Sequence, residues 1–404
     1  MKVYLMHKNI ITARIEVSLN GDLSKVELNN ENFEHLPLGC QMNNMKFHKW
    51  WEDRAVPKTR KGVKHALREL DFSSTACMLV QNLALSLNDC YWIKPADSNY
   101  TWENVSLFRN NFIDIFGELT FDTRKHLSNQ IKQTRFLYVS SAGELQKKWC
   151  IDNNNNRFLV KGNWDSSYQQ SLNEIFTTLI NKYQDFNNYT SYSFINVKCE
   201  DDKDALGCYS YNFCNEDIEF ISAWELLQTV KLGKNDSYFN KLLEVCKNIG
   251  ISDIDFNKFL SYEIMMDYLI SNTDRHMNNL GILRNPNTLE VIGFAPIYDN
   301  GNSMFFRTKN LDTVRFNIIE THSFLKFEKS LLKLVKYRDL LDLDKLPNYN
   351  EFIKIYSNDI PERINRYDKV WDLFQRKISV LRSFQEGNSV WKRRNLGQSG
   401  IKYY

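Results

Sequence analysis

Two short polar segments carry side chains that suit phosphoryl transfer. The first, residues 271–279, contains Asp274 and Asn279 in the order D-x-x-x-x-N, and the second, residues 295–301, contains Asp299. Phosphoryl transfer requires a group that orients or deprotonates the attacking hydroxyl, together with oxygen ligands for Mg²⁺. Magnesium prefers hard oxygen ligands and usually takes one or two carboxylates. Asp274 therefore fits the role of base, and Asn279 and Asp299 fit the role of metal ligands.

The elements around these segments have to bring them together. Residues 256–270 follow a helical pattern, and Ser252 comes before them as a helix-capping residue. The apolar residues of this helix fall on one stripe: Phe256, Phe259, Leu260, Ile264, Tyr268 and Leu269. Residues 280–294 contain two apolar runs around an Asn-Pro-Asn turn, which predicts a hairpin. We expect the helix to deliver Asp274 and the hairpin to lead into Asp299.

These residues also have an ordinary structural explanation. Asp and Asn are frequent in turns because their side chains bond nearby backbone groups. An isolated Asp-Arg-His is more often an exposed loop, and His276 is expected to brace the loop rather than act as a base. A much rarer combination is a D-x-x-x-x-N string followed by a hairpin and then by an apolar strand that ends in Asp-x-Gly. This combination favours a catalytic site.

With these motifs, the chain resembles the HipA-like bacterial serine/threonine kinases. The resemblance lies in residues 274–279, in the hairpin and in residues 296–303. It implies that Asp274 is the catalytic base and that Asn279 and Asp299 hold Mg²⁺. The D-R-H-x-x-N string is also similar to the catalytic loop of phosphoinositide lipid kinases, which share the wider kinase architecture.

The resemblance covers roughly residues 130–385, and more weakly the part before them. It implies an α+β, two-lobed protein-kinase-like fold with an N-terminal β-containing extension and a mostly helical C-terminal lobe. The expected domains are an extension over 1–130, a smaller kinase lobe over 131–214, a larger lobe over 215–390 and a basic tail over 391–404. In the extension, alternation over residues 10–17 and the pair Asn20-Gly21 predict strands joined by a hairpin turn.

A strand and a helix of the smaller lobe carry opposite charges that suit nucleotide binding. The strand over residues 157–161 ends in Lys161, and the following helix carries Glu174. Kinases place a strand lysine on the α- and β-phosphates of ATP and orient it with a helix glutamate. An ammonium group is a compact point charge that suits phosphate. We therefore expect Lys161 to bind ATP and Glu174 to position it.

A strand–loop–strand before Lys161 is the candidate phosphate-binding loop. Gly143 in this loop lets backbone N–H groups approach phosphates, although one glycine also fits an ordinary hairpin. The loop is similar to the S-x-A-G loop of HipA-like kinases, in some of which a loop serine is phosphorylated. By this resemblance Ser140 is the matching position and Ser141 its neighbour, so both are expected at the ATP site and are candidates for regulatory phosphorylation.

The composition of the 404 residues excludes several classes of protein. A hydrophobic content of 43% is enough for a sizeable core, and a net charge of +3 implies no general polyanion-binding surface. The eight cysteines form no CxxC pairs, which indicates reduced thiols in a cytoplasmic protein. The start of the chain lacks a signal-peptide pattern, and no apolar run approaches the ~20 residues that span a bilayer. We expect no membrane partner and no direct nucleic-acid binding.

A basic stretch over residues 58–68 allows two interpretations. It is either a patch for nucleic acid or an acidic partner, or the solvated face of a helix that buries Val63, Ala66 and Leu70. The nearly balanced overall charge favours the solvated face.

These observations predict an ATP- and Mg²⁺-dependent kinase that acts on a serine or threonine hydroxyl of a protein substrate. The resemblance further implies a growth-arresting toxin that pairs with a small DNA-binding antitoxin. One alternative is a lipid or small-molecule kinase, for which we find no convincing membrane-facing surface. Another is a non-catalytic nucleotide-binding interaction module, which would not need a base such as Asp274.

Overall fold

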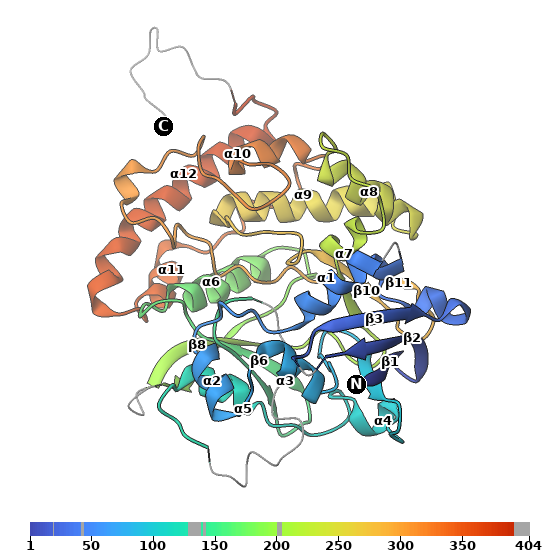
Figure 1. Ribbon diagram of the computed structural model, residues 1–404. Coiled ribbons are helices and arrows are strands. Elements are labelled where there is room, and N and C mark those ends of the chain that lie inside the picture. The colour runs from blue at the N-terminus through green and yellow to red at the C-terminus, as the bar shows by residue number, and fades with distance from the viewer. Residues whose placement is uncertain (19, 42–43, 128–138, 140–142, 200–203, 392–404) are drawn as a thin grey trace, which may run out of the picture. The chain divides into compact units, whose positions relative to one another are not determined.

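The computed structural model describes most of the chain (Figure 1). The described residues are 1–18, 20–41, 44–127, 139, 143–199 and 204–391. The chain divides into two compact units. Unit 1 consists of Met1–Asp165, Thr190–Lys234 and Gly281–Ala295, and unit 2 consists of Ser166–Tyr189, Asn235–Leu280 and Pro296–Tyr404.

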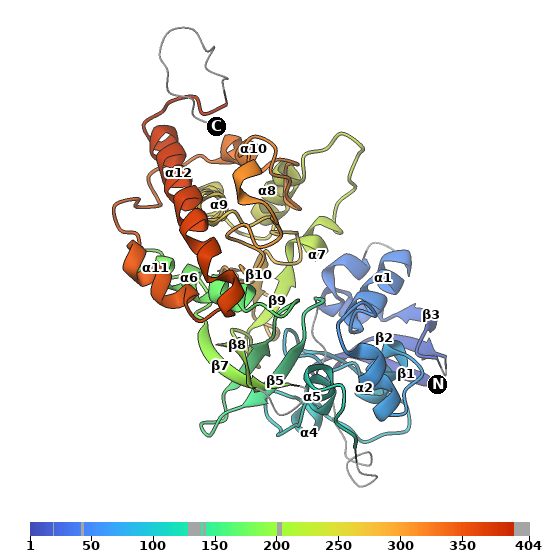
Figure 2. The ribbon, with the colours of Figure 1, turned by 90° about the vertical axis from the view of Figure 1, so that its left-hand side faces the viewer.

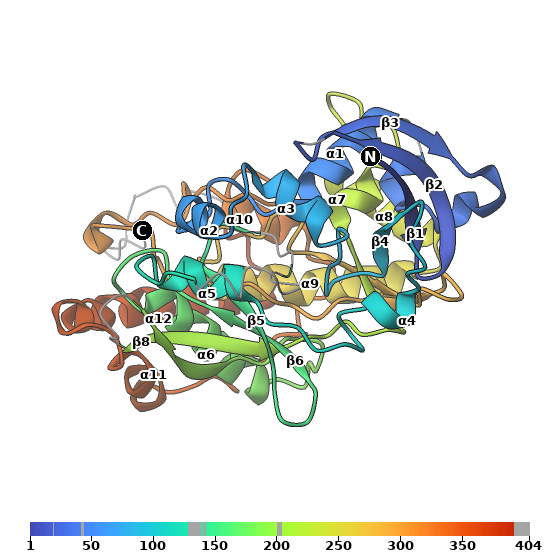
Figure 3. The ribbon, with the colours of Figure 1, turned by 60° about the horizontal axis from the view of Figure 1, so that its bottom comes forward.

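Unit 1 begins with an antiparallel sheet in the order β3-β2-β1-β4 (Figure 3). Its strands are β1 (Lys2–His7), β2 (Ile10–Val17), β3 (Leu23–Leu28) and β4 (Tyr91–Pro95). Gly21, between β2 and β3, has a φ of +86°, and a Cβ there would lie 2.3 Å from the backbone of Ala76. This turn therefore requires glycine. The predicted N-terminal strands and the turn at Asn20-Gly21 are confirmed.

A second antiparallel sheet of unit 1 has the order β5-β6-β8-β7 and contains Lys161. Its strands are β5 (Lys147–Ile151), β6 (Arg157–Lys161), β7 (Ser193–Lys198) and β8 (Asp204–Tyr211). Lys161 is the last residue of β6 and pairs with Lys147 on one side and Cys208 on the other. The strand predicted to end in Lys161 is thus confirmed.

A third sheet of unit 1, in the order β11-β10-β9, contains the predicted hairpin. Its strands are β9 (Glu219–Ser222), β10 (Gly281–Arg284) and β11 (Val291–Phe294). The sequence predicts a helix from residue 221 onward. This prediction is wrong for Ile221 and Ser222, which end β9. A short apolar run does not distinguish a strand from a helix. The helix α7 (Ala223–Leu227) starts only after Ser222, whose side chain accepts a hydrogen bond from the N–H of Glu225.

The other helices of unit 1 are short and pack their apolar sides on these sheets and on one another. They are η1 (Asn30–His35), η2 (Leu38–Gln41), α1 (Asn44–Arg54), α2 (Val63–Glu69), α3 (Thr75–Gln81), α4 (Trp102–Val105) and α5 (Ile115–Phe121). In the basic stretch, Val63 and Ala66 are buried while Lys64 is exposed, as expected of a solvated helix face. Arg60 departs from this expectation: it is buried and donates from Nε to the carbonyl of Gly143 at 3.0 Å.

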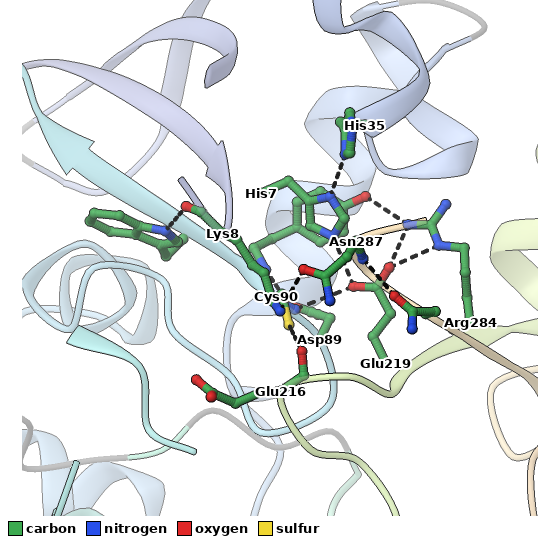
Figure 4. A network of polar contacts seen from close by, with 12 residues as sticks. His7, Lys8, His35, Asp89, Cys90, Glu216, Glu219, Arg284 and Asn287 are labelled. Carbon is green, nitrogen blue, oxygen red and sulfur yellow. Dashed lines mark hydrogen bonds and ion pairs between the residues drawn. The ribbon is translucent and has the colours of Figure 1, made fainter. Parts of the chain in front are cut away.

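A buried polar network joins the first and third sheets of unit 1 (Figure 4). Nδ1 of His7, at the end of β1, lies 3.0 Å from Nδ1 of His35, and its Nε2 lies 3.1 Å from Oε2 of Glu219. Arg284 of β10 donates to Oε1 of Glu219 from Nε at 2.8 Å and from Nη2 at 2.6 Å. Charge-assisted hydrogen bonds of this kind are about twice as strong as neutral ones. They join segments that are far apart in the sequence.

Unit 2 is largely helical (Figure 2). Its helices are α6 (Gln169–Tyr183), α8 (Tyr238–Asn248), α9 (Asp253–Ile270), η5 (Leu311–Thr313), α10 (Glu328–Leu331), η6 (Leu332–Leu334), α11 (Tyr349–Tyr356), η7 (Pro361–Arg366) and α12 (Tyr367–Gln385). Where α6, α11 and α12 meet, the ring of Phe176 lies 5.2 Å from that of Phe352 and 5.5 Å from that of Phe374. Edge-to-face aromatic pairs at these distances stabilise a core beyond their burial.

The helix α9 is buried well beyond the stripe predicted for it. Ser252 caps it by accepting a hydrogen bond from the N–H of Asp255, as predicted. Glu263 and Asp267 are 2% and 4% exposed, because α8, α10 and α12 all pack against this helix. Buried carboxylates need a compensating partner. Glu263 and Asp267 on α9 therefore require a buried cation.

The α+β composition is confirmed, since unit 1 is rich in sheet and unit 2 in helix. The two-lobed kinase-like arrangement and the domain boundaries remain predictions. None of the eight cysteines, all of which are described, forms a disulfide. Among the described helices, none combines the length and the apolar character needed to cross a bilayer.

Candidate active site

The C-terminal end of α9 directs the loop that carries Asp274. Ser271 ends the helix in a left-handed conformation with a φ of 54°. The next residue, Asn272, donates from its backbone N–H to the carbonyl of Asp267 at 2.9 Å and from Nδ2 to the Asp267 carboxylate at 3.0 Å. Oδ1 of Asn272 accepts a hydrogen bond from the backbone N–H of Asp274 at 3.1 Å. The loop is therefore bound to the last turn of the helix.

The buried guanidinium of Arg275 joins this loop to the turn that carries Asp299. Its Nε and Nη2 donate to the two carboxylate oxygens of Asp267, each at 3.0 Å. Nη2 also donates to Oδ1 of Asn300 at 2.6 Å, and Nη1 donates to the carbonyl of Tyr298. A planar guanidinium has donors in several fixed directions. One arginine thus holds the residues on both sides of Asp299.

Two carboxylates of α9 keep Arg275 charged although it is only 2% exposed. Oε1 of Glu263 lies 3.5 Å from Nε of Arg275, in addition to the contacts with Asp267. Burial alone would lower the pKa of Arg275, but Asp267 and Glu263 hold it above its usual value. Burial raises the pKa of Glu263 against the opposing charge of Arg275. This cluster supplies the buried cation that α9 requires.

The carboxylate of Asp274 has polar neighbours whose contacts with it were not predicted from the sequence. Nδ2 of Asn302 donates to Oδ2 at 2.6 Å, and Nδ1 of His322 lies 3.0 Å from Oδ1. Nη2 of Arg307 lies 3.8 Å from Oδ2. The Asp274 side chain is 20% exposed, so the carboxylate is still accessible. These neighbours all follow Asp299 in the chain. Their separations from Asp274 along the sequence far exceed those that a helix or strand period relates, so no periodic pattern predicts the contacts.

The two predicted metal ligands are held by the same loop and turn. Asn279 donates from Nδ2 to the backbone carbonyl of Asp274 at 3.3 Å, and its own carbonyl accepts from Nη1 of Arg275 at 3.4 Å. Among the described residues none donates to Oδ1 of Asn279, which leaves this oxygen available to a cation. Asp299 is half-buried with a φ of 59°. Strained left-handed residues of this kind cluster at functional sites.

Glu174 makes a contact that sequence reasoning did not predict. It is 2% exposed on α6, and its Oε2 accepts a hydrogen bond from the backbone N–H of Asn300 at 2.9 Å. Glu174 therefore fixes the turn directly after Asp299. Its predicted role toward Lys161 stays a prediction, since the two residues belong to different units.

The predicted ATP lysine has a buried, partly aromatic environment in unit 1. Lys161 is 4% exposed, and its Nζ donates to the hydroxyl of Tyr192 at 3.0 Å. The same Nζ lies 4.8 Å from the centroid of the Tyr192 ring. Phosphate binding by this lysine remains a prediction.

The loop before Lys161 is described only in part. Gly143 has a φ of +87°, a left-handed conformation that favours glycine. Ser140 and Ser141 lie outside the described residues, and their predicted place at the ATP site is not tested.

His276 braces the loop that carries Asp274 through its backbone. Its N–H donates to the carbonyl of Asp274 at 2.9 Å, and its carbonyl accepts from the N–H of Asn279 at 2.8 Å. Its Nδ1 is buried and has no hydrogen-bond partner in the part of the chain that the structure describes. These contacts agree with the structural role expected for this residue.

A cavity of about 620 Å³ lies elsewhere in unit 2, between residues 184–185, residues 336–344 and the end of α12. Among the described residues that line it are no predicted site residues. Two of its lining charges pair with each other, since Nη2 of Arg382 lies 2.8 Å from Oδ1 of Asp344. The predicted site residues therefore lie outside this cavity.

Comparisons with known proteins give a structural match without a sequence match. No family model matches the chain, and no curated protein matches it. Among solved structures, the crystal structure of the Helicobacter pylori proinflammatory kinase CtkA matches with a TM-score of 0.45 and 18% sequence identity. The match covers 61% of this chain and 93% of that chain.

Proposed function

We propose that the chain is an ATP- and Mg²⁺-dependent protein kinase of the HipA-like type, which phosphorylates serine or threonine hydroxyls. The observation that supports it is the placement of Asp274, Asn279 and Asp299 on two segments that Arg275 ties together. Nη1 of Arg275 bonds to the carbonyl of Asn279 at 3.4 Å, and Nη2 bonds to Asn300 at 2.6 Å. A module that only binds nucleotide has no need of an accessible base such as the Asp274 carboxylate.

Asp274 orients the acceptor hydroxyl and accepts its proton. The 2.6 Å hydrogen bond from Asn302 to Oδ2 restrains the carboxylate, while 20% exposure leaves it accessible to a substrate. As the hydroxyl oxygen bonds to the γ-phosphorus of ATP, the bond from that phosphorus to the β–γ bridging oxygen breaks and ADP leaves. A positioned base of this kind contributes roughly 10²–10⁴-fold to the rate.

The donor set fits Mg²⁺ in kind, because Oδ1 of Asn279 and the carboxylate of Asp299 are hard oxygen ligands. The conformation of Asp299, with a φ of 59°, is supported on both sides by the bonds of Arg275 and Glu174 to its neighbours. When bound, Mg²⁺ neutralises negative charge on the β- and γ-phosphates. We assign Lys161 to the α- and β-phosphates and Glu174 to the orientation of that lysine.

Two conservative variants separate the assigned roles. Asp274→Asn keeps the shape of the side chain but removes the base, so transfer of labelled γ-phosphate should fall by roughly 10²–10⁴-fold while ATP affinity changes little. Asp299→Asn should instead weaken the Mg²⁺-dependent part of ATP binding, measured by fluorescence titration. Asp339→Asn, in the separate cavity, is the matched control and should behave as the parent.

Parent-like transfer by both Asp274→Asn and Asp299→Asn would show that the site is assigned wrongly. ATP binding by the parent without any turnover would favour the interaction module. Offering labelled ATP with a protein extract and, separately, with phosphoinositide-containing vesicles distinguishes the protein kinase from the lipid kinase, because only the preferred acceptor becomes labelled.

A further inference from the structure

His322 touches the candidate base from a segment to which no motif drew attention. Its Nδ1 lies 3.0 Å from Oδ1 of Asp274, and its side chain is 70% exposed. An ionised carboxylate only accepts hydrogen bonds, so Nδ1 of His322 carries the proton in this contact. An exposed side chain keeps a single conformation only if its surroundings restrain it. For His322, the backbone contacts of its loop provide this restraint.

The loop that carries His322 is bound to the candidate site and closed at its base. The backbone N–H of His322 donates to the carbonyl of Thr273, the residue before Asp274, at 2.9 Å. Where the loop starts and ends, Glu320 and Phe327 form an antiparallel bridge. The backbone therefore sets the position of the imidazole before any side-chain contact forms.

A buried ion pair anchors this loop in unit 2. Glu328, the first residue of α10, donates from its backbone N–H to the carbonyl of Ile319 at 3.0 Å. Its Oε2 lies 2.5 Å from Nζ of Lys377 on α12, and both side chains are at most 1% exposed. Separating such a pair would leave an unpaired charge in the interior. The ion pair therefore resists displacement of the loop that carries His322. The phosphoryl-transfer mechanism proposed above does not itself require this pair.

We propose that His322 is a positioning residue for Asp274, an inference that rests on the kinase function proposed above. Asn302 holds Oδ2 at 2.6 Å and His322 holds Oδ1 at 3.0 Å, so both oxygens of the carboxylate are restrained. Each carboxylate oxygen accepts more than one hydrogen bond, which leaves Oδ1 able to accept one from an acceptor hydroxyl. His322 thus lowers the barrier to transfer without touching ATP.

The test compares variants of the full chain at this position. His322→Ala removes the donor, whereas His322→Asn keeps one, because Nδ2 of asparagine is attached to Cγ as Nδ1 of histidine is. Lys326→Ala is the matched control: this side chain lies on the same loop, is 67% exposed and pairs with Glu320 at 2.9 Å, not with Asp274. ADP release is measured with a randomised pool of serine- and threonine-containing peptides as the acceptor, at varied ATP concentration.

His322→Ala should lower kcat by roughly 10–100-fold, because a displaced catalytic group costs rate. Its KM for ATP should stay within about twofold of the parent's, since His322 takes no part in nucleotide binding. His322→Asn should restore kcat to within about threefold of the parent, and Lys326→Ala should match the parent. A loop residue that acts only through stability would not show this rescue together with an unchanged KM.

A kcat for His322→Ala equal to or above that of the parent overturns the inference, as does an equal loss in His322→Ala and His322→Asn. If the parent transfers no phosphate to any acceptor, the proposed function fails and the inference fails with it. If transfer depends on Asp274 but not on His322, the proposed function stands and only the positioning role is removed.

Discussion

Single side chains around α9 decide whether the candidate site has a defined geometry. Arg275 is 2% exposed and reaches both segments that carry the predicted ligands. It compensates the two buried carboxylates of α9 and uses its remaining donors on Tyr298 and Asn300. Its contribution is geometric, because it holds the backbone of Asn279 and the two residues next to Asp299.

Replacing Arg275 should therefore destabilise unit 2 strongly. Arg275→Gln leaves Glu263 and Asp267 buried without a cation, and we expect a loss of roughly 3–5 kcal/mol in the free energy of unfolding. Arg275→Lys keeps the charge but not the planar fork, so its loss should be smaller. Urea denaturation measures both. Arg382→Gln, whose side chain is 48% exposed, is the control and should cost less than about 1 kcal/mol. A stability of Arg275→Gln equal to that of this control contradicts the account.

Glu174 offers a test of two roles at one position. If it only holds the N–H of Asn300, then Glu174→Gln keeps an acceptor and should preserve activity. If it also orients Lys161, loss of its charge should lower kcat/KM for ATP. The account predicts a fall of roughly tenfold for Glu174→Gln, since the ionised form is needed to orient an ammonium group. Parent-like kinetics of this variant would restrict Glu174 to the turn after Asp299.

At the scale of elements, the network of His7, Glu219 and Arg284 holds β1 against β9 and β10. Burial alone would raise the pKa of Glu219, but His7 and Arg284 lower it to about 2. The folded-state value lies below the unfolded value of 4.5. Ionised Glu219 therefore stabilises the fold above about pH 4.5, and this contribution is lost as the pH falls toward about 2.

Glu219→Gln should remove this acid-sensitive contribution. We expect it to cost roughly 3–5 kcal/mol at neutral pH, because Arg284 is left buried without its partner. The free energy of unfolding of the variant should also depend less on pH between about 5 and 2 than that of the parent. Glu320→Gln, at a side chain that is 64% exposed, is the matched control for loss of a charge. Identical acid-unfolding curves for the parent and Glu219→Gln would contradict the assigned role.

Elements with strong local patterns were predictable, and elements that depend on distant partners were not. The N-terminal strands, the strand ending in Lys161, the hairpin and the cap at Ser252 follow from alternation and turn residues. The strand β9 was missed because it is short and becomes a strand by pairing with β10. The contact of His7 with Glu219 spans 212 residues, and no local pattern reports it.

The same limit applies to the candidate site. The spacing of Asp274 and Asn279 places both on one loop, and the hairpin accounts for the turn with Asp299. Of the residues that hold the carboxylate of Asp274, Asn302 lies within the recognised segment 296–303, but His322 lies outside any motif, and only tertiary packing brings both to Asp274. Their catalytic and metal-binding roles remain predictions until activity is measured.

For the whole molecule, binding of ATP with Mg²⁺ should raise thermal stability. A ligand present at about 100 times its Kd stabilises the folded state by roughly 2.7 kcal/mol. Differential scanning fluorimetry should show a larger rise in Tm with ATP and Mg²⁺ than with ATP and a chelator. Asp299→Asn should abolish this difference, because it removes a proposed ligand carboxylate. An equal rise with and without Mg²⁺ would contradict the metal assignment.

The most direct measurement is mass spectrometry of the chain after incubation with ATP and Mg²⁺, with and without the peptide acceptors. The account predicts phosphate on serine or threonine, in the chain itself or in the acceptors, with ADP released in equal amount. It predicts that Asp274→Asn yields roughly 10²–10⁴-fold less of both products. Absence of phosphate and ADP with the parent, or the same products from Asp274→Asn, would contradict the role given to Asp274.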